Sequence, residues 1–279
     1  MQELKDDNGN LIKMGLYNLK GFIDNGLALN EAAVQTMASI CSGAQETEVK
    51  YYNMDIKTIS PDYYPIECAL LNQMTFFTGS YPLFHSTLFS DDIFKNTFIA
   101  KSDADTYYCI ENNLDLILKK EEKLSNLIIE LQNAEDNIRY VKKLNIKIQN
   151  IKKQITDLSV STQNLIIKNC FTKELNSIRT LDELKQFQEH LYKFKDILIY
   201  ADNTCFYNQF YCDAMAKLDE KRNQIKYGLI GYFNDFQKDL AIIENNTFSI
   251  NFFKKLITKI KLLLKIKSTN TEKILRLND

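Results

Sequence analysis

The feature that most constrains the fold is the near absence of turn-forming residues over most of the chain. No glycine occurs between Gly79 and Gly228, and Pro82 is the last proline of the 279 residues. Sheet proteins need frequent tight turns, which favour Gly, Pro, Asn and Asp. Helix interiors disfavour both Gly and Pro. The sequence therefore predicts an all-α fold built from long helices.

The pattern of apolar residues predicts three parts. Residues 1–102 form an aromatic-rich, mainly helical head, residues 103–170 a long amphipathic helix or a helical hairpin, and residues 171–279 a helical bundle with a basic C-terminal helix. Residues 1–10 are polar and are expected to be a frayed start. Apolar and polar residues alternate around residues 52–57, which predicts one short strand whose partner is unidentified.

Three local signals predict where helices begin. Asn30 is expected to be the N-cap of a helix, because its side-chain oxygen can accept from a free backbone N–H. Pro65 suits the first turn of another helix, where the missing N–H costs nothing. Thr180 and Glu183 have the spacing of a capping box, which opens a third helix.

The middle part carries a heptad-like apolar seam. Apolar residues recur at alternating steps of three and four between Leu124 and Leu165, except where a three-residue step from Val141 to Leu144 breaks the phase. One helix over this part would be roughly 95 Å long, more than the width of a compact domain. The sequence leaves two alternatives, a projecting stalk or a reversal near residues 145–150 or 159–162.

A basic face lies opposite the seam. Five basic residues fall within about 140° of one helix face. They are Arg139, Lys142, Lys143, Lys147 and Lys153, and no acid occurs between residues 137 and 156. The face is predicted to bind a protein partner, and the alternative is an ordinary solvated surface. The net charge of −1 gives no global field for nucleic acid, so no nucleic-acid partner is expected.

Residues 252–267 predict a basic amphipathic helix. Its apolar side includes Phe253, Leu256, Ile257 and Ile260, and its lysines include Lys254, Lys255, Lys259 and Lys261. A helix of this make-up can lie on an anionic membrane. Packing on the protein's own core and docking of a protein partner are the alternatives.

One pair of residues suits nucleophilic catalysis. Cys68 and His85 lie in the aromatic-rich segment 51–108, and a cysteine-dependent hydrolase or transferase needs a thiolate beside a base. The alternative is a buried, inert thiol, because the helical neighbours of Cys68 are apolar. The chain has no CxxC pair and no glycine-rich phosphate loop, so neither a metal nor a cofactor is expected.

The cysteines and the N-terminus indicate a compartment. Six scattered cysteines are expected to be free thiols, as in a reducing environment. The first ten residues lack the basic and apolar regions of a secretory signal, and no window approaches about 18 apolar residues. A cytoplasmic location is therefore expected.

The basic helix of residues 252–267 and the polar tail STNTEKILRLND resemble the C-termini of helical effectors that intracellular bacterial pathogens inject into host cells. The abundance of Lys, Asn and Ile and the coiled-coil-like middle are similar in style. The acidic, Glu-rich tail motif of many such effectors is absent. The resemblance implies action in the host cytosol, through host proteins or membranes. The leading prediction is a non-catalytic protein–protein interaction module, with a homodimer as one form of it.

Overall fold

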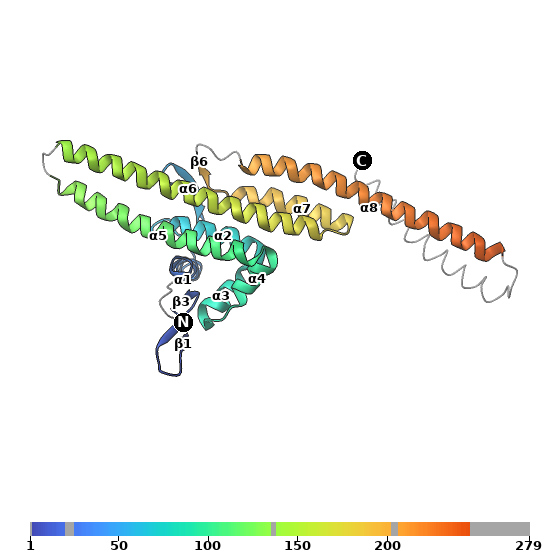
Figure 1. The fold of residues 1–279 in the computed structure, drawn as a ribbon, viewed down its shortest axis with the longest axis horizontal. Helices are drawn as coiled ribbons and strands as arrows, with labels where there is room; N and C mark the ends of the chain where they lie inside the picture. The colour runs from blue at the N-terminus through green and yellow to red at the C-terminus, as the bar shows by residue number, and fades with distance from the viewer. Residues whose placement is uncertain (1, 20–24, 135–137, 202–205, 246–279) are drawn as a thin grey trace. The chain divides into compact units, whose positions relative to one another are not determined.

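A computed structural model describes residues 2–19, 25–134, 138–201 and 206–245. These ranges contain eight α-helices and two three-stranded sheets (Figure 1). The prediction of a predominantly helical chain is confirmed, but all-α is too narrow because of the sheets. The chain divides into two compact units, residues 1–219 and 220–279. The predicted boundaries after residues 102 and 170 both lie inside the first unit.

The N-terminal sheet consists of three short antiparallel strands. They are β1 (Glu3–Lys5), β2 (Leu11–Met14) and β3 (Tyr17–Asn18). Asp6 closes the β1–β2 turn, since its carboxylate accepts from the backbone N–H groups of Asn8 and Asn10. The expectation of a frayed start is therefore wrong for residues 3–10.

The second sheet joins segments from distant parts of the sequence. Its strands are β4 (Thr47–Tyr51), β5 (Met54–Thr58) and β6 (Tyr200–Ala201), in that order and antiparallel. The predicted strand corresponds to β5, and its unidentified neighbours are β4 and β6. Tyr52 and Asn53 form a two-residue turn in which both have positive φ, as in a type I′ hairpin.

Four short helices complete the N-terminal part. They are α1 (Leu27–Cys41), α2 (Pro65–Thr78), α3 (Ser80–Phe89) and α4 (Ile93–Lys101). α2 begins at Pro65 as predicted. α1 begins before Asn30, so the predicted N-cap is wrong. The Asn30 side chain is buried in α1, where its Oδ1 accepts from the Leu16 N–H.

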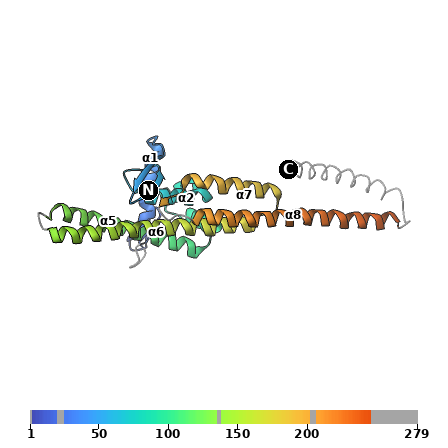
Figure 2. The ribbon, with the colours of Figure 1, turned by 90° about the horizontal axis from the view of Figure 1, so that it is seen from above.

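The two long helices α5 (Ala104–Gln132) and α6 (Ile138–Ser177) lie side by side and antiparallel (Figures 1 and 2). Residues of the predicted seam are buried along both helices, at Leu124, Leu127, Leu144, Ile148, Ile151 and Ile155. Of the two alternatives, the structure has the hairpin. The chain reverses between Gln132 and Ile138, not at either predicted place. The apolar steps continue across this stretch and obscure the turn-forming Asn and Asp residues at 133, 136 and 137.

The remaining described elements are α7 (Leu181–Phe194), the 3₁₀ turn η1 (Lys195–Ile197) and α8 (Phe206–Asn245). The predicted capping box is confirmed, since Thr180 and Glu183 each bond the other's backbone N–H. Aromatic rings of α7 pack edge-on against Phe171 of α6. None of the helices in the described ranges combines the length and apolar character needed to cross a bilayer. The bundle over residues 171–279 stays a prediction.

Candidate functional site

Cys68 lies in the interior of the head, on the side of α2 that packs against α1. Its side chain is buried, and Sγ contacts the carbonyl oxygens of Ala32 and Tyr63 at 3.7 and 3.9 Å. Burial raises the pKa of the thiol to about 12. The thiolate, which is the nucleophilic form, is therefore scarce at neutral pH.

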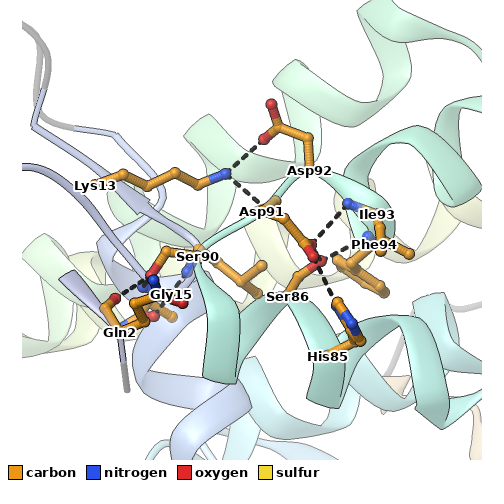
Figure 3. A network of polar contacts seen from close by, with 12 residues as sticks. Gln2, Lys13, Gly15, His85, Ser86, Ser90, Asp91, Asp92, Ile93 and Phe94 are labelled. Atoms are coloured by element: carbon orange, nitrogen blue, oxygen red, sulfur yellow. Dashed lines mark hydrogen bonds and ion pairs between the residues drawn. The ribbon is translucent and has the colours of Figure 1, made fainter. Parts of the chain in front are cut away.

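His85, the other half of the predicted pair, faces a carboxylate on the next loop. Its Nδ1 lies 2.6 Å from Oδ2 of Asp91 (Figure 3), and its ring packs between Tyr81 and Phe89. Across the described residues, no hydrogen bond joins His85 to Cys68. The structure therefore does not give this pair the contact that thiol activation requires.

Asp91 is the centre of a polar network at the α3–α4 corner (Figure 3). Its Oδ1 accepts from Ser86 Oγ at 2.6 Å, and the Lys13 Nζ bonds its carbonyl oxygen and Oδ1 of Asp92. Burial alone would raise the pKa of Asp91, but hydrogen bonds from Ser86, Ile93 and His85 hold it below its ordinary value.

This network lacks the order of a catalytic triad, in which the carboxylate and the hydroxyl bond opposite nitrogens of the imidazole. Here the Ser86 hydroxyl and His85 both bond the carboxylate of Asp91. Ser90 Oγ also links Gln2 and Gly15 of the N-terminal segment to the same corner. The arrangement fixes the first sheet to α3 and α4, and we assign it a structural role.

The five residues of the predicted basic face lie at two separate positions along α6. Lys153 lies on the wall of a cavity, whereas the other four basic residues lie near the start of α6. The same part of the hairpin exposes Ile129 by 52%, Ile138 by 72% and Ile146 by 63%. We call the three isoleucines and the four basic residues together the hairpin end: Ile129, Ile138, Arg139, Lys142, Lys143, Ile146 and Lys147.

Two stripes run along α6 within the hairpin end. Ile138, Lys142 and Ile146 follow one another at four-residue spacing, and the remaining basic residues form a second stripe at the same spacing, so each set lies along the helix surface. Of the residues that the structure describes, none forms an ion pair with the four basic side chains of the hairpin end. The surface thus combines exposed apolar groups with four basic side chains that form no ion pair among the described residues.

One pair of interacting carboxyl groups was not predicted from the sequence. Glu67 of α2 is fully buried and interacts with the carboxyl group of Glu121 of α5. Burial raises the pKa of both groups, and the charge of Glu67 raises that of Glu121 further. The two groups therefore favour a protonated form. The available signal was an acid within the apolar run of α2, residues 65–71.

The amphipathic segment 252–267, with its eight predicted membrane- or partner-binding residues, lies outside the described residues. Comparisons of the chain with protein-family models, with curated proteins and with solved structures found no match. The function must therefore be argued from the geometry of the chain itself.

Proposed function

We propose that the chain is a non-catalytic protein-binding module, and that the hairpin end holds an acidic amphipathic helix of a protein partner. The observation that carries the proposal is the exposure of Ile138 and Ile146, by 72% and 63%, beside four basic side chains without ion pairs in the described part of the chain. Exposed apolar groups with complementary charge around them are typical of binding surfaces.

The spacing of the hairpin end supports a helical partner. Ile138 and Ile146 are two helical turns apart, with Lys142 between them. A partner helix with apolar residues at similar spacing can pack between the isoleucines. Acidic residues on its flanks would pair with Arg139 and Lys143. Two copies of this surface would bring like charges together, so a homodimer through the hairpin end is disfavoured.

The proposal includes the compartment in which the interaction takes place and the origin of the partner. Cys41, Cys68, Cys109, Cys170 and Cys212 are free thiols, which suits a reducing cytosol. The resemblance to injected effectors makes a protein of an infected host cell the proposed partner. The seam of the hairpin is filled by the chain itself, so the exposed hairpin end is the better candidate for the contact.

The test compares the full chain with two charge-matched variants as baits in a host-cell lysate. The binding variant carries Arg139→Glu and Lys143→Glu, and the control carries Lys185→Glu and Lys193→Glu on the exposed side of α7. A zero-length carbodiimide reagent then joins lysines to nearby carboxylates. We expect cross-links from Lys142 or Lys147 to Asp or Glu of a captured protein, and loss of that protein only with the binding variant.

Two outcomes would contradict the proposal. One is capture of the same proteins by both variants, and the other is an absence of cross-links at the hairpin end. Flotation with vesicles of neutral or anionic lipid separates a membrane from a protein partner, because a lipid surface would bind the wild-type chain without any protein.

A further inference from the structure

A cavity of about 550 Å³ lies on the side of α6 that contacts the second sheet. Its walls come from the middle of α6, from the β4–β5 turn at Tyr52 and Asn53, and from Ala201 of β6. Thr156 of α6 donates a hydrogen bond to the carbonyl oxygen of Tyr52 at 2.9 Å. This bond holds the turn against the helix and so fixes the mouth of the cavity.

The β4–β5 turn that lines the cavity has an unusual backbone conformation. Tyr52 has φ of 50°, a left-handed conformation that costs energy for a bulky residue. Asn53 beside it has φ of 66°, which Asn tolerates better. The contact with Thr156 stabilises this conformation, and it places the Asn53 carboxamide at the cavity.

Three charged side chains line the cavity without compensating one another. Lys153 and Asp157 are one helical turn apart, yet within the described ranges neither forms an ion pair. Lys152 lies beside them and also has no ion pair there. The cavity therefore offers two positive groups and one negative group, a net charge that favours an anionic ligand.

Carboxamides supply most of the other polar groups. Asn53, Gln149, Asn150 and Asn164 line the cavity. The Oδ1 atom of Asn164 is buried and has no hydrogen-bond partner among the described residues. An unpaired buried acceptor is destabilising. Because this oxygen is enclosed by the protein, it lies behind the cavity wall, and a ligand would be bound by the other carboxamides.

We propose that this cavity is a binding site for a phosphorylated sugar. A carboxamide both donates and accepts hydrogen bonds, as a hydroxyl group does, so several carboxamides together suit a ligand rich in hydroxyls. Lys152 and Lys153 would pair with the phosphate, and Asp157 and the Gln149 carboxamide would accept from sugar hydroxyls. The volume lies within the range of sites for small ligands.

The experiment is calorimetric titration of the full chain with glucose 6-phosphate and ribose 5-phosphate, with glucose and inorganic phosphate as controls. We expect saturable binding of at least one sugar phosphate, about tenfold tighter than either control, because the charged and the hydroxyl contacts add. Lys153→Gln and Gln149→Ala should each weaken that binding about tenfold. Lys168→Gln, on the same helix but outside the cavity, should leave it unchanged.

Several results would overturn the proposal. They are the absence of saturable binding of both sugar phosphates, equal binding of inorganic phosphate, and equal loss of binding in the Lys168→Gln variant. Circular dichroism of each variant distinguishes loss of binding from loss of fold, and Lys153→Gln changes an exposed residue that no core contact requires. Because Lys153 is not part of the hairpin end, failure here leaves the proposed protein contact untouched.

Discussion

At the scale of single residues, the strongest electrostatic feature is the buried carboxyl pair of Glu67 and Glu121. Burial raises the pKa of both groups above the ordinary value of 4.5, and no opposite charge in the described part compensates them. The folded chain therefore binds protons that the unfolded chain has released. The stability contributed by the protonated pair is fully present below about pH 4.5 and is lost as the pH rises through the raised values.

We predict that the free energy of unfolding decreases as the pH rises from 5 to 9, measured by urea denaturation. Glu121→Gln removes one of the two costly ionisations and should make this decrease shallower. Glu122→Gln changes the exposed neighbour and should leave the slope as in the wild type. Parallel pH profiles for Glu121→Gln and the wild type would contradict this account.

The cysteines offer a second prediction at this scale. Cys68 and Cys170 are buried, whereas Cys41, Cys109 and Cys212 are exposed. We expect iodoacetamide to label Cys41, Cys109 and Cys212 quickly in the native chain, and Cys68 and Cys170 only after denaturation, as followed by peptide mass spectrometry. Fast native labelling of Cys68 would instead support the cysteine-dependent enzyme.

At the scale of elements, α1 depends on a cap supplied by another helix. Gly26 precedes α1 and has no side chain to serve as a cap. Asp115 of α5 replaces it, because its carboxylate accepts from the backbone N–H groups of Gly26 and Ala28 at 2.8 and 2.9 Å. The negative charge also suits the positive end of the helix dipole.

We predict that Asp115→Ala lowers the free energy of unfolding by about 1–2 kcal/mol, because two buried N–H groups lose their acceptor. Asn112→Ala, one turn earlier on the exposed side of α5, should change it by less than about 0.5 kcal/mol. Chemical denaturation of the three proteins measures both effects. Equal losses in the two variants would refute the capping role of Asp115.

The elements also indicate how far a sequence can be interpreted locally. The start of α2 at Pro65 and the start of α7 after Thr180 could be predicted, because each start signal lies within the first turn of its own helix. The cap of α1 was not, since Asp115 lies 89 residues from Gly26. The chain reversal after Gln132 was not predicted from the sequence. The apolar steps of the seam run from α5 into α6 without a break, and they obscured the turn-forming Asn and Asp residues between the two helices.

The candidate sites also divide into features that depend on neighbouring residues in the sequence and features that depend on distant ones. The exposed basic residues of α6 could be found from helical periodicity alone, since one helix carries them all. The exposure of Ile138 and Ile146 could not, because it depends on where α5 ends beside α6. The phosphate-binding role proposed for Lys153 depends on the turn at Tyr52, which only the folded chain brings to α6.

At the scale of the whole molecule, the first compact unit contains both sheets, the hairpin and α7. The residues of the seam and of the aromatic core belong to this unit. We predict that a fragment of residues 1–219 unfolds cooperatively, with a thermal midpoint within a few degrees of the first transition of the full chain. Circular dichroism measures both. A fragment without a cooperative transition would show that the two units depend on each other.

The short strand β6 has a consequence for synthesis. Because Tyr200 and Ala201 pair with β5, the edge of that sheet has no neighbour until the ribosome has made the head, the hairpin and α7. Until then the Met54–Asp55 segment of β5 lacks its native partner and can pair with other chains. A chaperone that shields extended segments would thus be needed most during the synthesis of residues 59–199, and premature termination in that interval would yield aggregation-prone products.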